Sequence, residues 1–184
     1  MSSFGLHKST AHLRRVMLQV GVDCEEIARF RQLPFNRNKG FYRRIFTPNE
    51  IKYCISFRDP YPRFTVRFAA KEATIKALNK IAKPFYTDIE IQKDKKKQPK
   101  IHIDKDKFKE IARFDILLSL THTNSYAIAF VVVTDNKNIV EEVEHVLKRS
   151  AAYTKKKMCK PRYTRSKGRG FTVGSNLICH SSPL

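Results

Sequence analysis

RFAAKEATIKAL, residues 67–78, predicts the helix around which the rest of the chain is organised. Alanine and leucine are strong helix formers, and the larger apolar residues of this stretch recur at helical spacing. Glu72 and Lys76 lie one turn apart, so they share a face of the helix. Taken alone, the pair is compatible with a solvated salt bridge of little energetic value. The segments before and after the helix favour a functional role instead.

The chain carries 37 basic and 17 acidic side chains among its 184 residues, a formal net charge of +20. This length is enough for one domain with a hydrophobic core, and the charge favours a negatively charged partner. No apolar run reaches the roughly 18–20 residues that span a bilayer, so no membrane segment is expected. The four cysteines are scattered without a CxxC pair, which indicates a reduced, cytoplasmic protein without structural disulfides.

Composition divides the chain into three regions. Residues 1–16 contain three basic residues and no acid, and are either a weak targeting segment, which would imply an organelle, or an upstream start. Residues 17–150 are expected to form the globular domain. Residues 151–184 carry eight basic side chains, no acid and mostly small or polar residues, which predicts a disordered tail.

The apolar run at residues 16–23 predicts a first strand that ends on Asp23. A helix is expected to start near Glu25, with Asp23 as its N-cap. Gly21 removes a side chain at a point where another backbone or a ligand comes near. The N-cap role of Asp23 requires no metal.

The remaining segments predict a mixed α+β domain. The expected elements are a helix introduced by a capping box at residues 47–50, a hairpin of residues 89–92 and 99–103, a short helix over 105–112, a second hairpin of residues 115–123 and 126–133, and a terminal helix over 139–149. The strand at 126–133 is almost wholly apolar, so we expect it to be central in its sheet.

Three local patterns follow one another in the chain. They are Gly21-Val22-Asp23-x-x-Glu26-Ile27-x-Arg29, Arg67-Phe68-Ala69-Ala70-Lys71-Glu72-Ala73-x-x-Lys76-Ala77 and Leu118-Ser119-Leu120-Thr121-His122-Thr123-x-x-Tyr126-Ala127-x-Ala129. Together they resemble the 4′-phosphopantetheinyl transferases of the single-domain holo-acyl-carrier-protein synthase type. The resemblance covers residues 17–135 and neither extension. It implies an α+β fold in which a largely antiparallel sheet packs against a central helix.

The resemblance implies transfer of the phosphopantetheine arm of coenzyme A to a serine of an apo-acyl carrier protein, a step of fatty acid biosynthesis. Positioning and charge neutralisation supply most of the catalysis of such a reaction, and Mg²⁺ suits its oxygen ligands. The metal acids of the family fall on Asp23 and Glu72. The catalytic lysine falls on Lys76, placed to stabilise or protonate the leaving phosphate, and Lys71 is expected to contact coenzyme A.

The polar residues of the second hairpin complete the expected site. Ser119, Thr121 and His122 match a clamp for the pyrophosphate and the adenine nucleotide of coenzyme A, although a hydroxyl-rich turn with one histidine is ordinarily turn chemistry. His122 is either a catalytic base for the serine hydroxyl or a phosphate contact. Glu25 is a candidate third metal ligand, because in an extended segment it points the same way as Asp23.

The expected partner is the acidic acyl carrier protein, which a basic surface would attract. Arg29 matches the arginine that the family presents to the carrier, and four further arginines extend its surface or are merely solvated: Arg31, Arg37, Arg43 and Arg44. The resemblance also implies a homotrimer. The alternative, a small basic domain that binds RNA or DNA, leaves the two acids unexplained. It also does not explain why the strand at 128–133 is apolar and poor in aromatic residues, where an RNA-binding sheet would show stacking rings.

Overall fold

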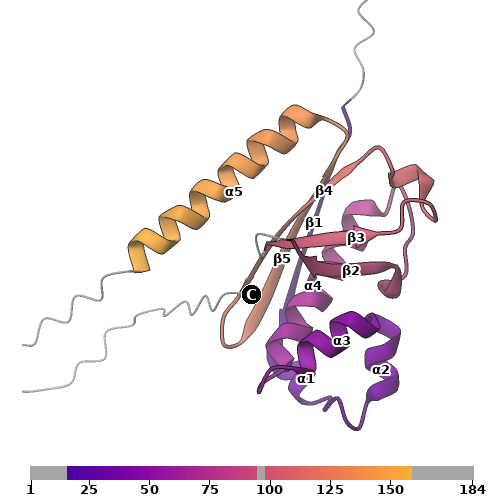
Figure 1. Cartoon of the computed structure of the whole chain (residues 1–184), viewed down its shortest axis with the longest axis vertical. Coiled ribbons are helices and arrows are strands. Elements are labelled where there is room, and N and C mark those ends of the chain that lie inside the picture. The colour runs from indigo at the N-terminus through magenta and orange to yellow at the C-terminus, as the bar shows by residue number, and fades with distance from the viewer. Residues whose placement is uncertain (1–15, 95–97, 159–184) are drawn as a thin grey trace, which may run out of the picture.

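A computed structural model describes residues 16–94 and 98–158. The elements are β1 (Leu18–Glu26), α1 (Ile27–Arg31), α2 (Lys39–Ile45), α3 (Pro48–Ile55), α4 (Tyr61–Leu78), β2 (Ile89–Lys93), β3 (Pro99–Ile103), β4 (Asp115–His122), β5 (Tyr126–Thr134) and α5 (Lys137–Met158). Short 3-10 turns occupy Tyr86–Asp88 and Lys109–Ile111. The strands form a three-stranded antiparallel sheet in the order β1-β5-β4 and a separate β2-β3 hairpin, which confirms the α+β class (Figure 1).

Helix α4 packs across the three-stranded sheet, and Gly21 sets how closely it approaches. A Cβ atom at Gly21 would lie 1.9 Å from the carbonyl oxygen of Ala73, so no larger residue fits at this crossing. The expectation that another backbone comes near Gly21 is thereby confirmed. Because Asp23 follows two residues later on the same face of β1, the crossing also brings Asp23 beside α4.

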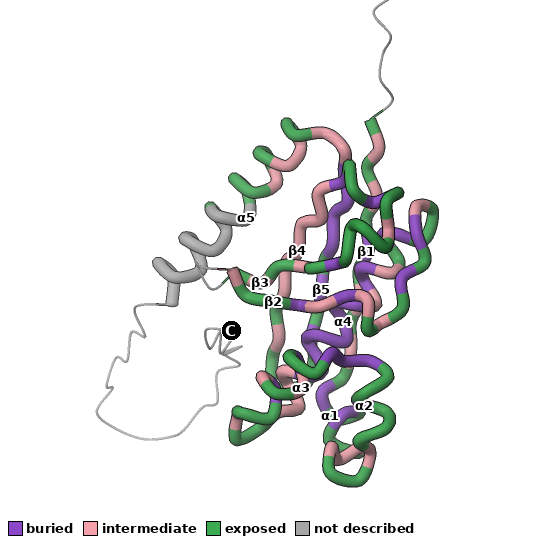
Figure 2. The backbone as a smooth tube through the Cα atoms, turned by 45° about the vertical axis from the view of Figure 1, so that its right-hand side comes forward, coloured by how far each residue is buried: buried purple, intermediate pink, exposed green. Residues whose placement is uncertain are grey.

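Strand β5 is the central strand of its sheet, as its apolar sequence predicts. In the antiparallel register, Asp23 pairs with Ala129, which pairs with Leu120 on β4. Directly opposed residues point to the same face of a sheet, so all three face α4. The buried residues on this side continue from α4 into the central strand (Figure 2).

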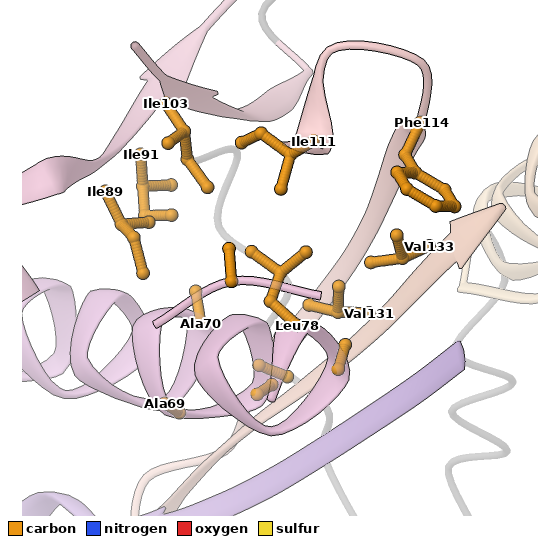
Figure 3. Packing of buried hydrophobic residues seen from close by; sticks show 14 residues of the cluster. Ala69, Ala70, Leu78, Ile89, Ile91, Ile103, Ile111, Phe114, Val131 and Val133 are labelled. Carbon is orange, nitrogen blue, oxygen red and sulfur yellow. The ribbon is translucent and has the colours of Figure 1, made fainter. Parts of the chain in front are cut away.

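Two hydrophobic clusters surround α4. One lies between α4, the sheet and the β2-β3 hairpin, and Figure 3 shows its aliphatic side chains converging on the alanines of α4. The other is aromatic and joins α1, α2 and α3 to the first half of α4, with Tyr42, Phe46 and Phe64 fully buried. The alanines therefore serve close packing, while the aromatic cluster holds the short helices in place.

The predicted capping box is confirmed: the Thr47 side chain accepts from the main-chain N–H of Glu50, and the Glu50 carboxylate accepts from that of Thr47. Asp23, by contrast, is not an N-cap. Strand β1 continues to Glu26 because residues 24–26 pair with β5, and α1 begins only at Ile27. Ladder hydrogen bonds have prevailed over local helix propensity there.

Two other boundaries differ from expectation. The helix expected over residues 105–112 is reduced to the 3-10 turn, because Phe108 leaves the helical conformation (φ −119°, ψ 72°) and packs against the core. Helix α5 runs to Met158, past the predicted end at residue 149, through alanines and lysines that favour helix. The predictions for residues 1–15 and 159–184 lie outside the described residues. Within the described part, no helix is long and apolar enough to cross a membrane.

Candidate active site

Asp23 on β1 and Lys76 on α4 form the centre of the site. The Lys76 ammonium donates to Asp23 Oδ1 at 2.8 Å and to the main-chain oxygen of Val22 at 3.1 Å. The Asp23 side chain is only 11% exposed, whereas that of Lys76 is 51% exposed. The lysine therefore covers the carboxylate while its ammonium remains open to solvent. The sequence alone allows a salt bridge between Lys76 and Glu72 within the helix, but in the structure Lys76 forms its ion pair with Asp23.

Three carboxylates act on Lys76. Its pKa is raised, chiefly by the hydrogen bond to Asp23; burial, the next largest effect, lowers it, and the charges of Asp23, Glu72 and Glu25 raise it further. The structure thus brings the predicted acids Asp23 and Glu72 into the field of the predicted catalytic lysine. A raised pKa keeps Lys76 protonated throughout the neutral range.

Tyr86 contacts the second predicted metal acid, and the sequence analysis missed it. The phenol donates a hydrogen bond to Glu72 Oε1. Burial, and next the bond to Glu72, raises the pKa of Tyr86 to about 12, so the phenol remains a donor at neutral pH. Tyr86 lies fourteen residues beyond Glu72 in an irregular segment, where no periodicity predicts such a contact.

The two acids fit a magnesium ion. Asp23 Oδ2 is buried and has no hydrogen-bond partner among the described residues, so it is an acceptor available to a cation. No group of three histidine, cysteine, aspartate or glutamate side chains in the described ranges could hold a metal. Mg²⁺ does not require one, since one or two carboxylates with water and phosphate oxygens complete its octahedron. Glu25 forms an ion pair with Arg29 at 2.9 Å, which gives the third-ligand hypothesis no support.

Lys71 differs from its predicted role. Its side chain has no exposed surface, and the ammonium donates to the main-chain oxygens of Ile45, Tyr86 and Ile89 at 2.6–2.8 Å. The Glu50 carboxylate lies 2.6 Å away as its counter-charge. A fully bonded, buried ammonium presents nothing to a phosphate, so the prediction that Lys71 contacts coenzyme A is wrong for this structure. The residue instead ties α2, α3 and β2 to α4.

The predicted clamp is divided between two faces of the sheet. His122 pairs with Ala127 and faces α4, whereas Ser119 and Thr121 face the other side, because side chains alternate along β4. A single chain therefore does not bring the three residues together. Burial, and next the positive charge of Arg63, lowers the pKa of His122, so the imidazole is neutral at neutral pH.

Two arginines four residues apart on α4 make a cationic cluster that the sequence analysis also missed. Arg67 is 5% exposed and its guanidinium lies 4.2 Å from the ring centre of Tyr53, while Arg63 lies 4.7 Å from that of Phe57. Arg67 Nε, Arg63 Nη1 and the Tyr53 hydroxyl are buried without a hydrogen-bond partner among the described residues. These unused donors are suited to an anion, and the charge of Arg63 also acts on His122. The i,i+4 spacing of the two arginines was the available signal.

A cavity of about 210 Å³ lies between α1, α2 and α4, beside Tyr86. Its lining is apolar apart from one arginine: Arg29, Phe30, Leu33, Phe41, Ile45, Phe68 and Tyr86. Arg29 is exposed, and the four other predicted docking arginines are exposed as well. The site thus combines carboxylates and a lysine at the β1–α4 crossing with an apolar cavity next to a basic surface.

Comparison with known proteins agrees with this geometry. Residues 19–131 match the ACPS family, described as the 4′-phosphopantetheinyl transferase superfamily. The holo-[acyl-carrier-protein] synthase of Chlamydia felis is 42% identical over 118 residues, covering 63% of this chain and 96% of its own length, and that of Chloroherpeton thalassium is 35% identical over 122 residues, covering 65% and 100%. The crystal structure of the Helicobacter pylori synthase in complex with coenzyme A is 31% identical, with a TM-score of 0.51, over 62% of this chain and 98% of that one. The chain belongs to the 4′-phosphopantetheinyl transferase superfamily, as a member of the holo-[acyl-carrier-protein] synthase type.

Proposed function

We propose that this chain transfers the 4′-phosphopantetheine arm of coenzyme A to a serine of an apo-acyl carrier protein, giving the holo-carrier and adenosine 3′,5′-bisphosphate. The observation that carries the proposal is the meeting of Asp23 from β1 with Lys76 from α4, within the field of Glu72. This arrangement lies within the segment that matches the family. It supplies the charges that a phosphoryl transfer requires.

The reaction breaks a P–O bond of the coenzyme A pyrophosphate. The serine oxygen of the carrier attacks the phosphorus that bears the pantetheine arm, and adenosine 3′,5′-bisphosphate leaves with the bridging oxygen. Lys76, protonated and half-exposed, neutralises the charge that develops on the leaving phosphate. His122 is neutral, so it can accept the serine proton or donate one hydrogen bond to a phosphate.

Asp23 and Glu72 are the residues that would hold Mg²⁺. When bound, the ion neutralises pyrophosphate oxygens and lowers the pKa of a coordinated water. Asp23 contributes its buried, unpartnered oxygen, and Lys76 fixes the other oxygen of the same carboxylate. The metal-binding role thus rests on an acceptor that nothing else among the described residues satisfies.

We assign the nucleotide phosphates of coenzyme A to the cluster around Arg63 and Arg67. Its unused buried donors favour an anion, and arginine binds phosphate well because its fork of N–H groups matches two oxygens. Lys71 does not serve this role, because its ammonium is already bonded to three main-chain oxygens and paired with Glu50. His122, on which the charge of Arg63 acts, lies on the same face of the sheet as Asp23, so it stands between this cluster and the site at Asp23.

The acidic carrier is assigned to the exposed arginines of α1 and α2. Arg29 lies on the helix that follows the strand of Asp23, so a carrier bound there is close to the reacting groups. A surface of this charge accelerates association with an acidic protein and makes it sensitive to salt. The apolar cavity beside Arg29 offers room for an apolar group of the carrier or of the pantetheine arm.

Association of copies of this chain, as a homotrimer, is the arrangement we favour. Leu18, Val20 and Val22 of β1 are 50–51% exposed, and Ile128 and Phe130 of β5 are 40–41% exposed, all on the face away from α4. Contiguous exposed apolar surface of this kind marks an interaction site. Ser119 and Thr121 lie on the same face, so association would bring these hydroxyls to a subunit boundary.

The test is the mass of an acyl carrier protein after incubation with this protein, coenzyme A and Mg²⁺. The proposal predicts that the carrier gains the phosphopantetheine arm and that EDTA prevents the gain. An unchanged carrier mass, with a carrier that another transferase modifies under the same conditions, would contradict the proposed activity.

A further inference from the structure

Tyr86 is held at both its backbone and its ring. Its main-chain oxygen accepts from the buried ammonium of Lys71 at 2.8 Å. Its ring stacks on Phe68, with ring centres 5.8 Å apart and the planes inclined by 19°. Phe68 precedes Glu72 by one turn of α4, so the stacked ring directs the phenol along the helix. The position of the hydroxyl is therefore fixed by the surrounding structure.

The buried pair of Lys71 and Glu50 is what holds the backbone of Tyr86. Glu50 Oε1 also accepts from the main-chain N–H of Ile91, and Glu50 Oε2 from that of Thr47. Both charged side chains are at most 1% exposed. A network with all its charges paired in the interior is rigid, and it ends at the residue that contacts Glu72.

Asp23 and Glu72 have the same pattern of hydrogen bonds. Lys76 donates to one oxygen of Asp23, and Tyr86 donates to one oxygen of Glu72. The second oxygen of Asp23 has no partner, and none of the hydrogen bonds among the described residues reaches Oε2 of Glu72. Each carboxylate is thus oriented by one donor and retains one oxygen.

We propose that Tyr86 is a positioning residue for the divalent cation: its phenol orients Glu72 so that the remaining oxygen of this carboxylate binds the metal. The inference rests on the proposed function, in which Asp23 and Glu72 hold Mg²⁺. Glutamate has three rotatable side-chain bonds, and fixing them before the cation arrives removes part of the entropic cost of binding. Carboxylate ligands are commonly oriented in this way by an outer hydrogen bond, whose loss costs about 10–100-fold in metal affinity or activity.

Tyr86→Phe tests the inference, because it keeps the ring that stacks on Phe68 and removes only the hydroxyl. We expect the Kd for Mn²⁺, measured by electron paramagnetic resonance on the full chain with coenzyme A present, to rise about 10-fold. The Mg²⁺ concentration that gives half-maximal transfer should rise by a similar factor, while the KM for the carrier stays unchanged. A residue with a purely structural role would not produce this separation.

Tyr42→Phe is the matched control. It removes a different phenol, which is buried, donates to the main-chain oxygen of Leu33 at 2.9 Å and makes no hydrogen bond to a carboxylate. This variant should lose thermal stability and keep the Mn²⁺ affinity of the unmodified chain. Equal Mn²⁺ affinity in the Tyr86→Phe variant would overturn the inference, and so would tighter binding, which would show that the phenol competes with the cation.

The same experiments separate this inference from the proposed function. If the unmodified chain binds Mn²⁺ and Tyr86→Phe weakens that binding, the positioning role stands even if the carrier gains no mass. If the unmodified chain transfers the arm but both proteins bind Mn²⁺ equally, the function stands and the role of Tyr86 is refuted. Absence of Mn²⁺ binding by the unmodified chain also contradicts the inference.

Discussion

Lys71 and Glu50 are two buried charges on which the region around α4 depends. Burial lowers the pKa of the lysine, and the nearby carboxylate opposes that effect. The two charged side chains satisfy five main-chain groups from four elements, so their function is to define one arrangement of those elements. Such a pair need not add net stability, but removal of one partner leaves a buried charge uncompensated.

Glu50→Gln should therefore lower the free energy of unfolding by about 3–5 kcal/mol at pH 7, as measured by urea denaturation. The loss should diminish as the pH rises toward 10. The pKa of Lys71 is lower in the folded than in the unfolded chain, so the unfolded chain binds more protons and stability increases with pH up to the ordinary lysine value. A variant as stable as the unmodified chain would show that the pair is not structurally important.

The pKa of His122 depends on its surroundings in the folded chain. Burial, and next Arg63, lowers its pKa, so Arg63→Gln should raise the value observed by NMR titration toward, but not up to, the ordinary 6.5. Because the folded chain resists protonation of this side chain, His122 makes the protein less stable as the pH falls below about 6.5. His122→Gln should assign the resonance and reduce that acid sensitivity. A pKa unaffected by Arg63→Gln would place the arginine too far from His122 to act.

Among the elements, the crossing of β1 and α4 determines the site. It places Asp23 and Lys76 within hydrogen-bond distance although 53 residues separate them in the chain. The contact exists because Gly21 and the alanines of α4 let the two backbones approach. The site geometry and the core packing thus have the same origin.

Gly21→Ala should lower the free energy of unfolding by about 3 kcal/mol or more, since the added methyl meets the main-chain oxygen of Ala73 and neither backbone can move aside without loss of packing. Thermal unfolding measures the effect. Gly40→Ala is the control: a Cβ atom at this position in α2 would come within 4 Å of no neighbouring group, so the change should be neutral or stabilising by about 0.5–1 kcal/mol. Equal stability of the two variants would contradict the close crossing.

The same elements show what the sequence could predict. Helix α4, the capping box and the apolar central strand were predictable because their signals are local and periodic. Asp23, Glu72 and Lys76 could be proposed as site residues because they belong to motifs with fixed spacing, and the structure places Lys76 against Asp23 and within the field of Glu72. Tyr86 was not, since it lies in an irregular turn whose contact with Glu72 depends on the folded chain.

Burial and strand geometry explain where Lys71 and the predicted clamp differ from expectation. Lys71 is a charged residue, so the sequence alone predicts that it faces solvent or binds a phosphate. The folded structure shows instead that Glu50 and three main-chain oxygens bond its ammonium in the interior. Ser119 and Thr121 were grouped with His122 by proximity in sequence, whereas strand alternation divides them between faces. In both cases neighbours distant in sequence decide the role.

For the whole molecule, the uncovered apolar face of the three-stranded sheet is the main unsatisfied feature. Figure 1 and Figure 2 place α5 on the other side of this sheet from α4, running away from it. The strand residues on that face remain half-exposed even so. A second copy of the chain is the partner we assign to this face.

Val20→Asp should disrupt the association, because a charge in the centre of the apolar face would be desolvated without a partner. Light scattering coupled to size exclusion should give three times the mass of one chain for the unmodified protein and one mass for the variant. Gln92→Asp, exposed on the β2-β3 hairpin, is the control and should leave the mass unchanged. A monomeric unmodified protein with full transfer activity would contradict the trimer.

The central claim is that Asp23 and Glu72 form one phosphoryl-transfer site at the β1–α4 crossing. The most direct measurement is the rate at which intact-mass spectrometry shows the carrier gaining its arm, at saturating Mg²⁺, for Asp23→Ala, Glu72→Ala and the exposed control Glu110→Gln. We predict losses of at least about 100-fold for the first two, with folded structure retained, and an unchanged rate for the control. Full transfer rates in either alanine variant would show that the metal and the reacting phosphate lie elsewhere.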